Sequence, residues 1–141
     1  MSLVLDSSAT LARAFPEERT DAILDLFLLI ANLGAVVPEL WRIEVANTLN
    51  VGIRRGRINK THRQGILADL ESLPIFVDGE TRMHTWGKTL ELADQHNLTV
   101  YDATYLELAL RLALPLATLD DDLRQAAQQE GVPLLGEIAH A

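Results

Sequence analysis

Short apolar runs alternate with helix-patterned segments along the whole chain, and this alternation limits the folds open to it. The runs lie at residues 3–5, 35–37, 75–77, 115–119 and 132–135. Strands separated by helices pair in parallel, because each helical crossover returns the chain to the same edge of the sheet. The sequence therefore predicts a single α/β domain over residues 1–141, with a mostly parallel central sheet of four to five strands and helices on both faces.

The segments between the runs carry apolar residues at helical spacing and start at capping residues or prolines. The predicted helices cover about residues 9–15, 20–34, 39–55, 59–74, 80–96, 99–113 and 120–131. The helix over 99–113 is apolar on most sides, so we expect it to be well buried. Trp41 and Trp86 fall within predicted helices and are expected to be packing groups.

Acidic residues follow two of the strands and lie on two of the helices. Asp6 follows the first strand and Asp120 the fourth, so a parallel sheet brings both to its carboxyl edge, where α/β folds place their chemistry. Asp102 opens a helix whose N-terminal dipole favours an anion. Glu44 lies roughly 40° around its helix from Leu40, half turned toward the interior. The pattern predicts that these acids meet in one cleft.

Each acid also has a purely structural explanation. Asp6 can be a turn residue, Asp102 the acid of a capping box, Asp120 an N-cap and Glu44 a surface acid. Taken together, several carboxylates in one cleft repel each other, and a divalent cation is the usual remedy. An all-oxygen set in a chain without cysteine favours Mg²⁺ or Mn²⁺ over zinc.

The net charge of −8 argues against a polyanionic partner, but the charges are unevenly distributed. No acidic residue lies between Glu44 and Asp69, and this gap holds a basic segment at residues 54–63. It consists of Arg54, Arg55, Arg57, Lys60 and Arg63. The segment can contact RNA, serve a protein partner or be a solvated corner between two helices.

Bulk features exclude several classes of protein. The absence of cysteine rules out a disulfide framework and fits a reducing compartment. No apolar run approaches the length that spans a bilayer, and no leader precedes the first strand. We therefore expect a soluble cytoplasmic protein with no membrane partner.

Four segments together carry a family resemblance that covers nearly the whole chain. They are LVLDSS at residues 3–8, PELWxxEVAN at 38–47, YDAxYLxLA at 101–109 and LATLDxxL at 116–123. This pattern resembles the PIN domain and, in detail, the VapC toxins of type II toxin–antitoxin pairs. Asp6, Glu44, Asp102 and Asp120 match the acidic quartet of that family one for one. Asp122 is the reserve ligand.

The resemblance implies a three-layer PIN-like fold and an Mg²⁺- or Mn²⁺-dependent endoribonuclease. The quartet would then hold the metal and form the catalytic site, with Ser8 and Thr118 as supporting hydroxyls. Water activated by the cation would attack the phosphorus in line and leave a 5′-phosphate. The expected partners are an RNA substrate, a VapB-like antitoxin that inserts an arginine into the cleft, and a second copy of the chain in a homodimer.

Two other functions compete with this interpretation. One is a PIN-like module that has lost catalysis and only binds partners; the presence of all the acids argues against it. The other is a receiver-like signalling domain, which needs a lysine after a late strand. The chain has only Lys60 and Lys88, both far from the last strands.

Overall fold

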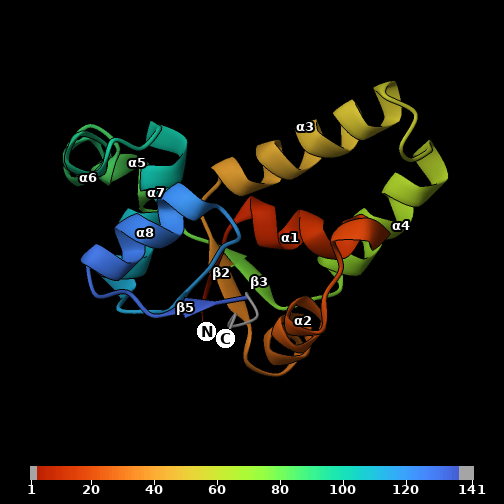
Figure 1. Cartoon of the computed structure of the whole chain (residues 1–141), viewed down its shortest axis with the longest axis horizontal. Helices are drawn as coiled ribbons and strands as arrows, with labels where there is room; N and C mark the ends of the chain where they lie inside the picture. Colours follow the sequence, from red (N-terminus) through yellow and green to blue (C-terminus); the bar gives the residue numbers. More distant parts are fainter. Residues whose placement is uncertain (1–2, 137–141) are drawn as a thin grey trace.

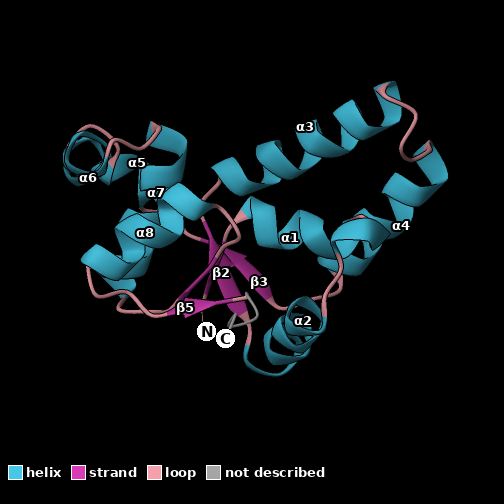
Figure 2. Cartoon of the chain, viewed as in Figure 1, coloured by secondary structure: helices cyan, strands magenta, loops and turns pink. Residues whose placement is uncertain are grey.

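The computed structural model describes residues 3–136, which form a central parallel sheet with helices on both sides (Figures 1 and 2). The strands are β1 (Val4–Leu5), β2 (Ala35–Val37), β3 (Ile75–Val77), β4 (Leu116–Ala117) and β5 (Leu134–Leu135). The helices are α1 (Ser7–Ala14), the 3₁₀ helix η1 (Pro16–Glu18), α2 (Asp21–Leu33), α3 (Leu40–Arg54), α4 (Lys60–Glu71), α5 (Thr81–His84), α6 (Lys88–His96), α7 (Val100–Leu112) and α8 (Asp121–Gln129).

The strand order is β3-β2-β1-β4-β5, and every pair is parallel. This confirms the predicted α/β class and a sheet of five strands. Val4 of β1 pairs with Val36 of β2 on one side and Leu116 of β4 on the other. The order reverses between β1 and β4, and such a switch point opens a crevice at the carboxyl ends of the strands.

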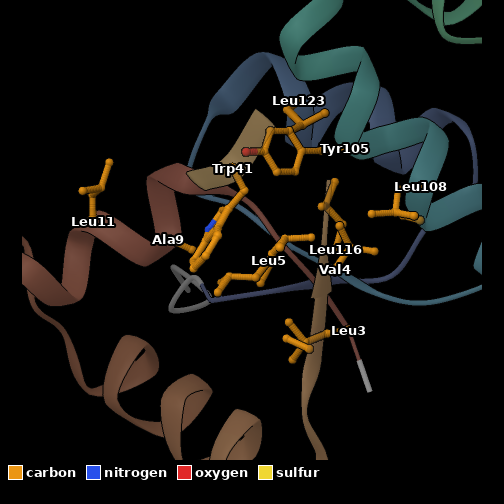
Figure 3. Packing of buried hydrophobic residues seen from close by; sticks show 14 of the residues in the cluster. Leu3, Val4, Leu5, Ala9, Leu11, Trp41, Tyr105, Leu108, Leu116 and Leu123 are labelled. Carbon is orange, nitrogen blue, oxygen red and sulfur yellow. The ribbon is translucent and has the colours of Figure 1, made fainter. Parts of the chain in front are cut away.

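Helices α1–α4 lie on one side of the strands and α5–α8 on the other in the view of Figure 1, which gives three layers. The first apolar run forms the centre of the core, where Leu3, Val4 and Leu5 are fully buried. Trp41 is buried beside it, as predicted (Figure 3). The Trp41 indole N–H donates to Thr10 Oγ1 over 2.8 Å. A core filled from strands and helices together fixes where each strand ends.

Local capping signals place the helix ends where the sequence predicts them. Thr20, Asn59, Thr99 and Asp120 each accept a backbone N–H from the first turn of their helices. Asn97 ends α6 in the left-handed conformation, with φ of 53°. These caps set the starting points of the two helices, α7 and α8, that carry predicted site residues.

The predicted continuous helix over residues 80–96 is wrong, because the chain breaks it into α5 and α6. The backbone leaves helical geometry at Gly87, where φ is −113° and ψ is −104°. Glycine weakens a helix interior, and here Gly87 is the N-cap of α6, at the end of the turn over residues 85–87 that follows α5. Trp86 lies in that turn and is 90% exposed, so its predicted packing role is also wrong.

No helix within residues 3–136 combines the length and the apolar character required to cross a bilayer.

Candidate active site

The site begins where β1 and β4 end side by side at the switch point of the sheet. The Asp6 N–H donates to the Ala117 carbonyl over 3.0 Å, which fixes Asp6 one residue beyond β1. Thr118 follows β4 directly, and Asp120 caps α8 two residues later. Parallel pairing therefore brings Asp6 and Asp120 to the same edge, as the sequence predicts.

Asp6 is 3% exposed and is held by hydroxyl groups. Its carboxylate accepts from Thr118 Oγ1 at 2.6 Å, Ser8 Oγ at 2.7 Å and Ser7 Oγ at 3.3 Å. Burial raises the pKa of Asp6, and the hydroxyl hydrogen bonds oppose that rise. Ser8 and Thr118 thus lie where the family resemblance places supporting hydroxyls.

The same two hydroxyls also order the chain after β4. Ser8 Oγ accepts the Leu119 N–H over 3.0 Å, and Thr118 Oγ1 accepts the Asp120 N–H over 3.1 Å. Each hydroxyl therefore donates to Asp6 and accepts from the loop that leads to Asp120. This network fixes the position of Asp6 relative to the start of α8.

Glu44 reaches the site from α3 and is held by Tyr105 of α7. The Tyr105 hydroxyl donates to Glu44 Oε1. Burial and the nearby charge of Asp6 raise the pKa of Glu44, while the Tyr105 hydrogen bond lowers it. Glu44 is half-buried, but the buried face of α3 consists of Trp41, Val45, Leu49 and Gly52 and not of the residues around Leu40 and Ile43. Tyr105 is fully buried, so its hydroxyl fixes the position of the Glu44 carboxylate.

Asp102 responds electrostatically to all the other predicted acids. Burial and then the charges of Asp120, Asp6 and Glu44 raise its pKa to about 6. Its backbone N–H donates to Thr99 Oγ1 over 3.1 Å, so the predicted cap forms. Within residues 3–136, no ion pair neutralises Asp6, Glu44 or Asp102. Among residues 3–136, carboxylates from four elements thus lie within electrostatic reach of one another.

Asp120 has the structural role that the sequence allowed and can also face the site. Its Oδ1 accepts the Leu123 N–H over 2.8 Å, which caps α8. Its other carboxylate oxygen makes no hydrogen bond within the described part of the chain. Asp122 is exposed two residues further along, in the first turn of α8, where it lines a separate pocket.

The donor set fits a hard divalent cation in its chemistry. All four predicted ligands offer oxygen, and neither cysteine nor histidine joins them. Among residues 3–136, no three acidic or histidine side chains are already close enough together to hold an ion. Asp6 is almost fully enclosed, whereas Glu44 and Asp102 are half-buried and Glu44 is held by Tyr105. A bound cation would need these carboxylates to come closer to Asp6.

The basic segment lies at the corner between α3 and α4. Arg57 pairs with Glu17 and stacks on the Phe15 ring, with 4.1 Å from the guanidinium carbon to the ring centroid. The side chains of Arg54 and Arg55 are exposed and make no hydrogen bond or ion pair with the described residues. The segment therefore divides into one arginine with a structural role and others that are free for a partner.

Sequence reasoning missed an apolar groove of about 670 Å³ between α3, α4 and β3. Its walls include Trp41, Ile43, Leu67, Leu73 and Val77. Ile43 is 70% exposed and is the residue before Glu44 on α3. An apolar residue at an exposed helix position was the available signal, but it could not reveal that α4 and β3 complete the groove.

Comparison with known proteins gives matches along most of the chain. The family profile described as PIN domain matches residues 3–129. Ribonuclease VapC3 of Pyrobaculum aerophilum is 32% identical over 129 residues, which cover 89% of this chain and 94% of that protein.

Two solved structures share the fold. The crystal structure of PAE2754 from Pyrobaculum aerophilum superposes with a TM-score of 0.69 at 24% identity, covering 95% of this chain and 90% of that one. FitAcB from Neisseria gonorrhoeae gives a TM-score of 0.60 at 14% identity, covering 94% and 96%. At these identities the superpositions show the fold alone.

Proposed function

Because this chain belongs to the PIN-domain family, we propose that it is an Mg²⁺- or Mn²⁺-dependent endoribonuclease and the toxin of a VapBC-type pair. The observation that carries the proposal is the set of unneutralised carboxylates from β1, α3, α7 and α8 at the switch point of the sheet. The similarity to Ribonuclease VapC3 supports the reaction class. The proposal treats residues 1–141 as one domain that acts in the cytoplasm.

Asp6, Glu44, Asp102 and Asp120 would hold the cation, which when bound supplies a water of lowered pKa and offsets phosphate charge. The protein contributes the positions of these ligands. Ser8 and Thr118 keep the Asp6 carboxylate in one orientation, and Tyr105 does the same for Glu44. The RNA phosphate would enter over Asp102 and Asp120, at the N-termini of α7 and α8, where the helix dipoles favour an anion.

The test is cleavage of RNA by the Asp6→Asn variant with Mg²⁺ or Mn²⁺ present. Asparagine keeps the shape and the hydroxyl contacts but removes the charge that holds the cation. Because a catalytic cation is worth several kcal/mol, we expect activity to fall at least about 100-fold. Asp25→Asn, which changes an exposed acid on α2, should cleave normally.

Normal cleavage by Asp6→Asn would refute the quartet assignment. If the unmodified protein neither cleaves RNA nor binds Mn²⁺ in a calorimeter, the competing function of an inactive binding module is correct. Circular dichroism of both variants separates these outcomes from misfolding.

The apolar groove supports the antitoxin part of the proposal. An amphipathic helix lays its apolar face into such a groove, and the exposed Ile43 and Leu67 offer the matching surface. Helix α3 carries both Ile43 and Glu44, so a segment leaving the groove can reach the carboxylates. An arginine on that segment would present paired donors to them.

A homodimer is also part of the proposal. Met83 of α5 is 72% exposed, and Trp86 in the turn between α5 and α6 is exposed as well. Large aromatic and thioether side chains of this kind are enriched at protein interfaces. This face lies on α5 and α6, away from the groove beside α3 and α4, so a second copy and an antitoxin can bind together (Figure 1).

A further inference from the structure

A polar pocket lies beside the carboxylate site, between the α6–α7 junction and α8. Its volume is about 280 Å³, and it is lined by His96, Asn97, Asp122, Gln125, Ala126 and Gln129. We propose that this pocket binds one nucleobase of the RNA next to the cleaved phosphate and selects bases with an exocyclic amino group over uracil. The inference rests on the proposed nuclease function and adds a base-specificity site to it.

One wall of the pocket is rigid. The His96 side chain is 3% exposed, and its Nε2 lies 2.8 Å from Glu130 Oε2. Its Nδ1 lies 3.0 Å from Gln129 Oε1. These contacts join the end of α6 to the end of α8. A wall fixed in this way can position a flat ligand without a large loss of entropy.

The other wall offers polar groups that the protein itself does not use. The side chains of Asn97, Asp122 and Gln125 are exposed and make no hydrogen bond or ion pair with residues 3–136. On α8, Asp122, Gln125 and Gln129 are three, then four, residues apart, which places them in one stripe along the helix. Asn97 faces them from the left-handed turn that ends α6.

These groups match the edge of a base in their chemistry. Side-chain amides pair with base edges through a donor and an acceptor together, and a carboxylate accepts from an exocyclic amino group. Uracil has no amino group to give to Asp122. A phosphate is a poor occupant, because no lysine or arginine lines the pocket and Asp122 repels it. The volume is below the ~300–1,000 Å³ of sites for drug-sized ligands, so it suits one ring system.

The pocket is next to the predicted reaction site along the chain. Asp122 is two residues beyond Asp120, and Asn97 is two residues before Thr99, the cap of α7. The stripe from Asp122 to Gln129 extends roughly 10 Å from that end of α8. An RNA strand whose phosphate lies over Asp102 and Asp120 can therefore place a neighbouring base in the pocket.

The experiment sequences the cleavage products of a randomised RNA pool. The protein should prefer amino-bearing bases over uracil at one fixed position near the cut. In Gln125→Ala that preference should fall about 5-fold or more, since a good base contact is worth 1–3 kcal/mol. Cleavage of pool molecules with an amino-bearing base at that position should fall, while cleavage of those with uracil there should change less, because phosphate contacts do not read the base.

Two further variants sharpen the test. Asn97→Gly removes the second amide while tolerating the left-handed backbone, and it should weaken the preference at the same position. Gln128→Ala is the matched control, since Gln128 is an exposed glutamine of α8 that does not line the pocket. It should leave the preference unchanged.

A binding measurement separates this inference from the nuclease proposal. Short oligo(A), oligo(C) and oligo(U) are titrated into the Asp6→Asn protein with and without Gln125→Ala. Tighter binding of oligo(A) or oligo(C) than oligo(U), lost in Gln125→Ala, supports the pocket even if no variant cleaves RNA. A cleaving protein whose base preference is the same in Gln125→Ala overturns the pocket and leaves the nuclease proposal intact. A protein that shows neither cleavage nor base discrimination overturns both.

Discussion

At the scale of single residues, the acids of the site differ in how the protein holds them. Asp6 has three hydroxyl donors and is almost fully enclosed, so its orientation is set by folding. Asp102 is half-buried, and the charges of Asp120, Asp6 and Glu44 raise its pKa. Asp6 is therefore the group best placed to anchor a cation, with the more exposed carboxylates around it.

The raised pKa of Asp102 predicts a pH-dependent effect of removing its charge. Its pKa rises from 3.8 to about 6, so the folded protein binds more protons than the unfolded chain between these values. Stability contributed by the neutral carboxyl is present below pH 4 and is lost as the pH rises through 6. In the metal-free protein at pH 7, Asp102→Asn should therefore be more stable by about 1–2 kcal/mol, allowing for partial exposure.

Thermal unfolding in a chelator checks this. The melting temperature of Asp102→Asn should exceed that of the unmodified protein by about 3–6 °C at pH 7 and match it near pH 4. Asp25→Asn should show no such pH-dependent gain. An equal effect of Asp102→Asn at both pH values would mean that repulsion at the site is not the cause.

At the scale of elements, the sequence predicts the helix starts well because each depends on one local side chain. Thr20 and Asn59 accept the hydrogen bonds expected of them. The wrong prediction of one continuous helix over residues 80–96 also has a local cause. Helical spacing of the sequence continues across the break before α6, so the pattern does not show it. The exposure of Trp86 follows from that break. A glycine inside a predicted helix was the available signal.

The basic segment can be tested at this scale, because the structure separates its arginines by role. If Arg54 and Arg55 contact the RNA backbone, replacing both with alanine should reduce the log–log salt slope of binding by about 1.4. The loss should be similar for unrelated RNA sequences, since phosphate contacts do not read bases. Binding is measured with the inactive Asp6→Asn protein across salt concentrations in Ca²⁺.

Arg57→Ala is the matched control for this experiment. Its contacts with Glu17 and Phe15 are made within the chain itself, so its loss should lower the melting temperature slightly and leave the salt slope nearly unchanged. An unchanged slope after loss of Arg54 and Arg55 would assign their surface to the antitoxin or to the dimer.

At the scale of the whole molecule, the sequence predicts that the acids meet but not how. Asp6 and Asp120 could be placed at one edge because each follows a strand of a parallel sheet. The position of β4 beside β1, which puts Thr118 against Asp6, depends on long-range pairing that no local pattern reports. The Tyr105 contact with Glu44 also needs α3 and α7 to pack across the site. Contacts between site residues that are distant in the sequence could therefore be found only from the structure.

A cation at this site would connect elements from both ends of the chain, and stability should report it. Asp6 follows the first strand, while Asp102 and Asp120 lie at the starts of the last two helices, so an ion held by all three resists their separation. An ion that binds only the folded protein at 100 times its Kd adds about 2.7 kcal/mol. For a domain of this size, Mn²⁺ should then raise the melting temperature by roughly 8 °C.

Asp6→Asn should lose most of that rise, and Asp25→Asn should keep it. A control with NaCl at the same ionic strength measures the part of the rise that comes from screening of the repelling carboxylates, because screening needs no bound ion. A Mn²⁺ shift of the same size in Asp6→Asn would place the ion elsewhere and remove Asp6 from the ligand set.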